Sequence, residues 1–152
     1  MAALSGDHVA ALAVVDRLLR RAQEPWWVIA GAAVALHARE RIAVDDIDVL
    51  LAMRDVPLIA DVTALVRKGG DGDARFRSAF YASLPVGTVD VEFMAGFALC
   101  GEQGWQPVRP RSRVLVDVAG VAVPVPDRAE LVAMLRAFGR PKDLQRARLL
   151  GG

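Results

Sequence analysis

The stretch VDDIDVLL at residues 44–51 places a run of acidic residues directly before an apolar segment. Such a segment predicts a β-strand that enters the core of the protein, and side chains alternate across a strand. Asp46 and Asp48 therefore point to one face, whereas Ile47 and Val49 point to the other. Two carboxylates on one face repel each other, so a cation is expected between them, and a divalent metal ion is the usual one.

The composition limits the class of protein. The chain has 152 residues, of which 54% are hydrophobic and 24% are charged, which is typical of a globular domain and excludes extended disorder. The formal net charge is +1, so no overall field attracts the molecule to nucleic acid or an anionic membrane. No apolar run reaches the roughly 20 residues that span a bilayer, and no secretory signal is recognisable. Because Cys100 is the only cysteine, a cytoplasmic protein without disulfides is expected.

Hydrophobic periodicity divides the first half of the chain into elements around the acidic strand. Apolar residues at helical spacing predict a helix over residues 7–22. A β-prone run that stops at Gly31, followed by helix formers, predicts a strand, a tight turn and a helix over residues 26–39. After the acidic strand, a further helix is expected from Asp55 to the glycines at 69–70.

The second half of the sequence predicts hairpins followed by helices. Glycine and proline break any period over residues 94–112. Elsewhere we expect strands over residues 74–83, 88–93, 114–118 and 121–125, and helices over residues 127–138, which starts with a capping box, and 141–150. The whole pattern predicts an α/β or α+β fold with a mixed central sheet flanked by helices. One domain over residues 1–152 is expected, with an N-terminal helix in 1–24, a sheet core over 26–125 and C-terminal helices over 127–150.

A second acidic strand lies in the first predicted hairpin. Asp90 and Glu92 share one face of this strand, and apolar residues occupy the other face. If it lies beside the strand of Asp46 and Asp48, carboxylates converge at one surface of the sheet. Such hard oxygen ligands suit Mg²⁺, and acids around one or two Mg²⁺ ions are typical of phosphoryl and nucleotidyl transfer.

The turn at Gly31 is compatible with the same chemistry. A strand that ends in glycine and continues into a helix offers free backbone N–H groups and a positive helix end to a phosphate. Taken alone, each motif is better explained structurally, Gly31 as a tight turn and the acids as a solvated strand end. The order and spacing of the two motifs favour the functional interpretation.

These motifs together resemble the nucleotidyltransferase fold of polymerase-β type. The resemblance rests on an apolar run and Gly31-Ala32, then Asp46-Ile47-Asp48, then Asp90 on a later strand. The segment at residues 140–144 is similar to the R-x-K-D-L segment of small bacterial members, which include AbiEii-type toxins and aminoglycoside or lincosamide nucleotidyltransferases. The resemblance covers residues 26–150.

The resemblance implies a Mg²⁺-dependent transfer of a nucleoside monophosphate from an NTP to a hydroxyl of a protein, RNA or small molecule. Asp46 and Asp48 match the metal-binding pair, and Asp90 matches the third acid, which binds metal and serves as general base. Gly31 matches the glycine of the phosphate-holding turn.

Two further positions belong to the nucleotide site that the resemblance implies. Ala32 stands where the family has Gly or Ser, so it keeps the backbone N–H and lacks a hydroxyl. Lys142 is expected to reach the triphosphate.

Three alternatives remain open from the sequence. Glu92 shares a face with Asp90 and can replace it as third acid. Because of Ala32, a catalytically inactive protein of the same fold that serves as a binding or antitoxin-like partner is a second hypothesis. A homodimer or a partner protein is compatible with the sequence, which specifies neither the NTP nor the acceptor.

Overall fold

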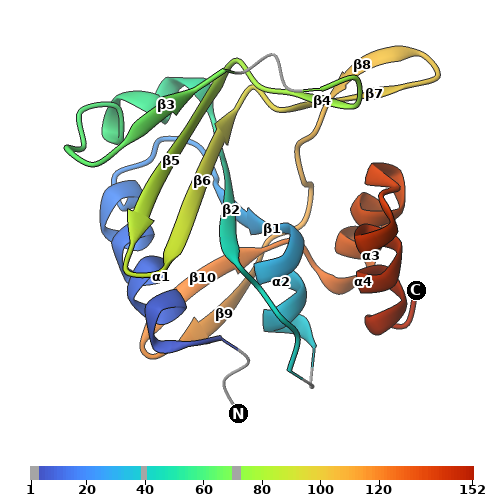
Figure 1. The fold of residues 1–152 in the computed structure, drawn as a ribbon, viewed down its shortest axis with the longest axis horizontal. Helices are drawn as coiled ribbons and strands as arrows, with labels where there is room; N and C mark the ends of the chain where they lie inside the picture. Colours follow the sequence, from blue (N-terminus) through green and yellow to red (C-terminus); the bar gives the residue numbers. More distant parts are fainter. Residues whose placement is uncertain (1–3, 39–40, 70–72) are drawn as a thin grey trace.

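The computed structural model describes residues 4–38, 41–69 and 73–152, and its central element is a five-stranded sheet (Figure 1). In spatial order the strands are β1 (Trp27–Ile29), β2 (Asp46–Leu51), β6 (Val89–Ala95), β5 (Phe80–Val86) and β3 (Val66–Lys68). β2 and β6 are parallel, and every other neighbouring pair is antiparallel. The predicted mixed sheet is therefore confirmed.

The register between β2 and β6 brings the two acidic stretches side by side. Asp46 lies opposite Asp90, and Asp48 lies opposite Glu92. Residues that are opposite each other on neighbouring strands point to the same face of the sheet, so all four carboxylates lie on one face.

The other face of the sheet forms the main hydrophobic core. Ile47, Val49, Val91 and Phe93 are fully buried there. Helix α1 (Gly6–Leu19) packs on this face, and so does a hairpin of β9 (Val114–Val118) and β10 (Val121–Val125). The alternation of acids and apolar residues in VDDIDVLL thus separates a buried face from a polar one.

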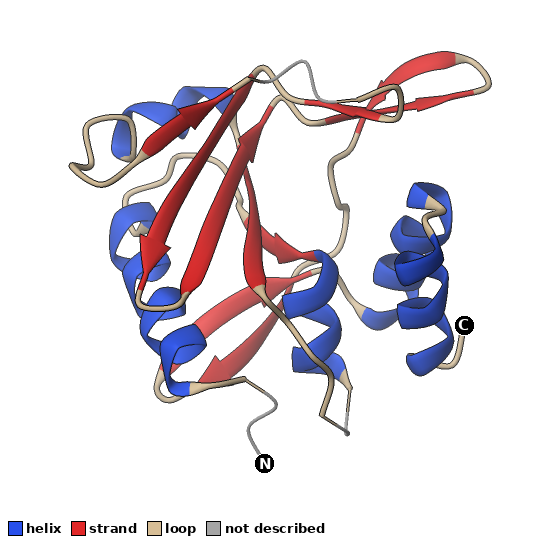
Figure 2. Cartoon of the chain, in the orientation of Figure 1, coloured by secondary structure: helices blue, strands red, loops and turns tan. Residues whose placement is uncertain are grey.

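Two C-terminal helices lie at the polar side of the sheet, and a third helix links them to the main core. α2 (Ala30–His37) follows β1 directly, and it contacts both α3 (Arg128–Phe138) and α4 (Pro141–Leu149). α3 and α4 lie side by side, across the sheet from α1 (Figure 2). A second, smaller apolar cluster joins these helices to the sheet through Trp27, Ile29, Ala30, Leu50, Phe97 and Phe138.

The prediction of a helix that runs from Asp55 to the glycines at 69–70 is wrong. Residues Met53–Leu58 form a short 3₁₀ helix, η1, and turns then lead into β3, which pairs with β5. The carboxylate of Asp55 is buried and accepts the backbone N–H groups of Gln23 and Glu24 at 2.9 and 3.0 Å. It therefore ties η1 to the segment that follows the first helix instead of capping a long helix.

The region without a clear sequence pattern forms a second small sheet. Its three strands are β4 (Phe76–Arg77), β7 (Ala98–Gly101) and β8 (Gly104–Pro107). They extend from the upper end of the main sheet as an arm (Figure 1). The glycines and prolines that obscured periodicity delimit these short strands.

Both predicted hairpins are present, although the first one turns later than expected. β5 continues through Leu84-Pro85-Val86, and the turn lies at Gly87, where φ is +60°. The second hairpin turns at Ala119 and Gly120, with φ of +50° and +88°, as predicted. Positive φ at both central residues matches the twist that two-residue hairpins need.

The C-terminal helices are confirmed, but the expected capping box is only half formed. Asp127 caps α3 by accepting the backbone N–H of Glu130 at 2.7 Å. The Glu130 carboxylate accepts the backbone N–H groups of Arg111 and Ser112 instead of that of Asp127.

Among the described residues, no helix is long and apolar enough to cross a membrane.

Candidate active site

A cavity of about 490 Å³ lies between the polar face of the sheet and the C-terminal helices. Acidic side chains from β2 and β6 line one side, and cationic side chains from the start of α4 line the other. Phe76, Phe97 and Phe138, which pack against one another with centroid distances of 5.3 to 6.1 Å, form an apolar wall. A cavity of this size is large enough for a small-molecule substrate.

Asp48 is at the centre of the acidic side. Its burial, together with the neighbouring carboxylates of Asp46 and Glu92, raises the pKa of Asp48 to about 7, although Lys142 and Arg140 oppose the shift. Burial disfavours the charged form, and like charges at short range add to that cost. The site is therefore electrostatically unfavourable at neutral pH without a cation.

Glu92 has an unsatisfied oxygen. Its Oε2 atom is buried and has no hydrogen-bond partner, while its Oε1 atom lies 3.5 Å from Lys68 Nζ. Tyr81 lines the same cavity, where burial and the charges of Glu92 and Asp48 raise the pKa of Tyr81 to about 12. A buried carboxylate oxygen without a partner is costly, so a ligand is expected to satisfy it.

Asp90 occupies a different environment from the other acids. It lies opposite Asp46 in the strand register, but it is exposed and does not line the cavity. The cavity thus brings together Asp46, Asp48 and Glu92, the residue that the sequence offered as an alternative to Asp90. Asp45, which precedes β2, also borders the cavity.

The donor set fits a hard divalent cation such as Mg²⁺. Carboxylates of Asp46, Asp48 and Glu92 supply oxygen ligands, and the unpartnered Glu92 oxygen needs a positive neighbour. As the side chains lie, no group of three or more His, Cys, Asp or Glu residues in the described parts of the chain is arranged to hold a metal ion. Mg²⁺ typically takes one or two carboxylates and completes its shell with waters and substrate phosphates, so a closed set of three acids is not required.

The tight turn predicted at Gly31 lies one residue earlier, next to the acids, and Gly31 is already inside α2. Ile29, the last residue of β1, lies opposite Asp48, and α2 starts at Ala30 with φ of +55° and no side-chain cap. The first N–H groups of α2 are therefore not satisfied by a capping side chain. Ala32 is 1% exposed and packs into the main core, so its side chain does not line the cavity.

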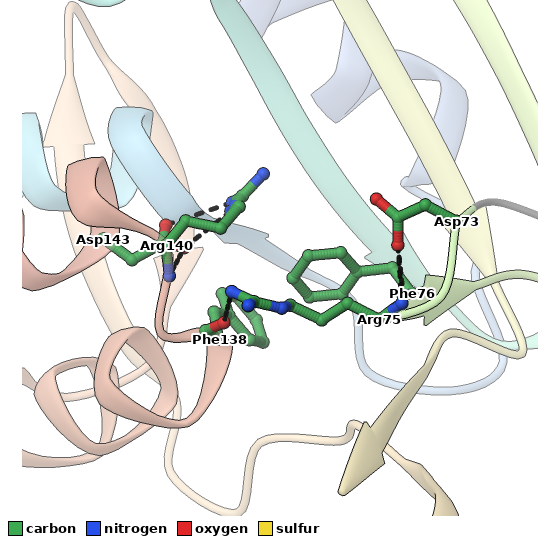
Figure 3. A network of polar contacts seen from close by, with 6 residues as sticks. All are labelled: Asp73, Arg75, Phe76, Phe138, Arg140 and Asp143. Carbon is green, nitrogen blue, oxygen red and sulfur yellow. Dashed lines mark hydrogen bonds and ion pairs between the residues drawn. The ribbon is translucent and has the colours of Figure 1, made fainter.

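The cationic side of the cavity is built by the start of α4. Figure 3 shows the polar contacts that hold this part of the chain in place. Arg140 donates to the fully buried Asp143 at 2.6 and 3.0 Å, and its guanidinium lies 4.9 Å from the centroid of the Phe76 ring. Arg75 donates to the carbonyl of Phe138 at 2.6 Å. These contacts fasten the β4 arm to the C-terminal helices and fix the place where α4 begins.

Lys142 lines the cavity, and Arg146, which no sequence motif indicated, lines it as well. The two residues are four apart on α4, so they lie on the same face of the helix. That spacing is the one signal in the sequence that could have identified Arg146 once Lys142 was chosen.

No family model matches the sequence, and no curated protein matches it. Solved structures do. A candidate nucleotidyltransferase from Thermotoga maritima superposes with a TM-score of 0.69 at 18% identity, over 95% of this chain and 92% of that chain. The antibiotic-resistance factor ANT(2'')-Ia, solved with adenylyl-2''-tobramycin, gives a TM-score of 0.60 at 16% identity, over 94% and 87%.

A third similar structure is the lincosamide antibiotic adenylyltransferase LnuA with bound lincomycin. It has a TM-score of 0.61 at 10% identity, over 94% of this chain and 96% of that chain. At such identities the likeness establishes the fold alone. The chain has the nucleotidyltransferase fold, as the sequence motifs predicted.

Proposed function

We propose that this protein is a Mg²⁺-dependent nucleotidyltransferase that moves a nucleoside monophosphate from an NTP to a hydroxyl group. The observation that carries the proposal is the meeting of Asp46, Asp48 and Glu92 with Lys142 across one cavity of the nucleotidyltransferase fold. Acids on one side suit a metal ion, and cations on the other suit a polyphosphate.

Each residue then has a role in the transfer. Asp46 and Asp48 hold the metal, which when bound neutralises charge on the triphosphate as a Lewis acid. The backbone N–H groups at Gly31 and Ala32 and the Lys142 ammonium orient the phosphates.

Glu92, in preference to Asp90, is the third acid in this proposal. Its unpartnered oxygen accepts the proton of the acceptor hydroxyl as the hydroxyl oxygen attacks the α-phosphorus. A new P–O bond to the acceptor forms, the bond between the α- and β-phosphates breaks, and pyrophosphate leaves with the bridging oxygen and its electron pair.

We favour a small molecule as the acceptor. Two proteins with similar structures have antibiotic-derived or antibiotic ligands, namely adenylyl-2''-tobramycin and lincomycin. The net charge of +1 gives no support to an extended nucleic-acid surface. The apolar wall of Phe76, Phe97 and Phe138 offers such a molecule a surface next to the acids.

Label transfer from α-labelled NTPs tests the proposal. Each NTP is incubated with the protein, with or without Mg²⁺, and with hydroxyl-bearing small molecules, tRNA or protein as acceptor. We expect Mg²⁺-dependent transfer that is lost in Asp46→Asn and kept in Asp117→Asn, which removes an exposed acid of β9. Transfer that survives in Asp46→Asn would contradict the proposal.

A binding protein of the same fold is the second candidate function. It is favoured by Ala32, which provides no hydroxyl to the phosphate-holding turn and packs into the core. Calorimetry with Mg²⁺ and each NTP separates the two functions, because tight nucleotide binding without release of pyrophosphate supports the binding protein. Turnover of the bound nucleotide would exclude it.

A further inference from the structure

Arg146 lies directly over the glycine of the phosphate-holding turn. A Cβ atom added to Gly31 would lie 2.9 Å from Nη2, 3.0 Å from Cζ and 3.3 Å from Nη1 of Arg146. All three distances are to the guanidinium, so the planar end of this side chain rests against the Gly31 backbone. Arg146 also borders the cavity that Asp46 and Asp48 line.

The contact explains why residue 31 is a glycine. Gly31 lies inside α2, and it is absent from the glycines of the described chain that have positive φ. Its backbone conformation is therefore open to any residue, and its lack of a side chain is needed for another reason. A methyl group here would displace the guanidinium of Arg146.

The charge of Arg146 is available to a ligand. Within the described residues, its guanidinium makes no hydrogen bond or ion pair, whereas Arg140 at the same cavity donates twice to Asp143. A partly buried guanidinium that is held in place without an anion is prepared to bind one. Lys142, one helical turn away, adds a second positive charge on the same face of α4.

We propose that Arg146 binds the polyphosphate of the substrate, so that α4 supplies the phosphate contact that the side chain of Ala32 does not. This inference rests on the proposed function and deepens it. The planar fork of a guanidinium makes two parallel hydrogen bonds to phosphate oxygens, and with Lys142 it favours ligands that carry two or more linked phosphates. The site is thereby selective for nucleoside triphosphates and pyrophosphate over nucleoside monophosphates.

Calorimetry of the whole protein with Mg²⁺-pyrophosphate and with each Mg²⁺-NTP tests the role of Arg146. Arg146→Ala should lower the affinity for pyrophosphate and for the NTPs roughly 10- to 100-fold, which is the range expected for the loss of hydrogen bonds to a charged group. Arg146→Lys, which keeps the charge and loses the fork, should recover only part of this affinity. Arg148→Ala is the matched control, because Arg148 is exposed on the same helix and does not line the cavity.

A double-mutant cycle separates ligand binding from general damage to the fold. Gly31→Ala should weaken pyrophosphate binding by displacing Arg146, and it should have little further effect in the Arg146→Ala background. The added methyl meets only the end of a flexible side chain, so folding should be retained, and circular dichroism of each variant checks this. Independent, additive losses would overturn the inference.

The outcomes distinguish this inference from the proposed function. Equal pyrophosphate affinity in wild type and Arg146→Ala overturns the role of Arg146, and nucleotidyl transfer by the wild type in that case leaves the proposed function intact. Loss of pyrophosphate affinity in Arg146→Ala supports the role even if no transfer is observed. A wild-type protein that binds neither pyrophosphate nor any NTP would contradict both.

Discussion

The two sides of the cavity differ in how they are encoded. The acidic side comes from β2 and β6, where alternation along each strand places Asp46, Asp48 and Glu92 on one face. The cationic side comes from α4, whose Lys142 lines the cavity and whose Arg146 reaches Gly31, more than a hundred residues earlier in the sequence. One side depends on local strand geometry, and the other depends on how α3 and α4 dock.

This difference divides the functions of the two sides. Carboxylates on rigid neighbouring strands are held in a fixed arrangement, which suits a metal ion with strict geometry. The cationic side chains of α4 carry the charges that suit a polyphosphate. Substitutions on the acidic side should therefore affect the chemical step, and substitutions on the cationic side should affect nucleotide affinity.

The largest expected effect is that of Asp48→Asn. Loss of this metal ligand should reduce nucleotidyl transfer by at least about 10³-fold, which corresponds to about 4 kcal/mol. Transfer of label from an α-labelled NTP measures this loss. A decrease of less than about tenfold would show that the acidic side does not carry the chemistry.

The same substitution should stabilise the metal-free protein. Because the pKa of Asp48 is raised to about 7 in the folded state, its ionisation costs stability as pH rises from about 4 through 7. Asparagine cannot ionise, so the free energy of unfolding should increase by up to about 4 kcal/mol at pH 8 and change little at pH 4. Urea unfolding in EDTA at both pH values measures the difference, and a variant less stable at pH 8 would contradict it.

Glu92→Gln and Asp90→Asn form a matched pair on one strand. Glu92→Gln should reduce kcat roughly 10²-fold because it removes the proposed general base, with the folded state retained. Asp90→Asn should change kcat by less than about threefold, since Asp90 is exposed outside the cavity. Steady-state kinetics compares the two, and the reverse ranking would restore Asp90 as third acid.

Ala32→Ser tests the turn at the start of α2. Ala32 is buried in the main core, so an added hydroxyl should cost about 1–2 kcal/mol of stability and give no gain in kcat/KM. Thermal unfolding and steady-state kinetics measure the two quantities. An increase in kcat/KM of tenfold or more would show that residue 32 contacts the phosphate through its side chain.

Glu130→Gln probes the attachment of the helical side and should have the smallest effect. Although burial opposes it, hydrogen bonds from Ser112 and the backbone of Arg111 hold the pKa of Glu130 below its usual range. Because its pKa is lowered in the folded state, ionised Glu130 stabilises the fold at pH values above its pKa in the unfolded chain. This stabilisation is lost as the pH falls through the folded-state pKa. Glu130→Gln should therefore lower the free energy of unfolding by about 1 kcal/mol at pH 7 and by less at pH 3, and urea unfolding measures both values. An equal cost at both pH values would exclude an ionic contribution.

The sequence was most informative where structure follows local pattern. Strand alternation predicted which face Asp46 and Asp48 occupy, and two β-prone runs separated by Ala119-Gly120 predicted the second hairpin. The helix from Asp55 was wrong because the carboxylate of Asp55 binds the distant backbone of Gln23 and Glu24, a contact that no local pattern encodes.

The cationic side shows the same limit at the site itself. The contact of Arg146 with Gly31 exists only once α4 docks against α2, so neither residue alone predicts it. Exposure likewise distinguishes Glu92 from Asp90, although both share a strand face in the sequence. The exposure of each side chain depends on which other elements cover that end of the sheet, and strand periodicity does not predict where those elements pack.

A crystal structure with Mn²⁺ and a non-hydrolysable NTP analogue tests the central claim most directly. We expect an anomalous manganese peak bound by Asp46 and Asp48, with the polyphosphate between the metal and the α4 cations Lys142 and Arg146. A nucleotide bound elsewhere on the molecule, or one in this cavity without metal at Asp46 and Asp48, would contradict the account.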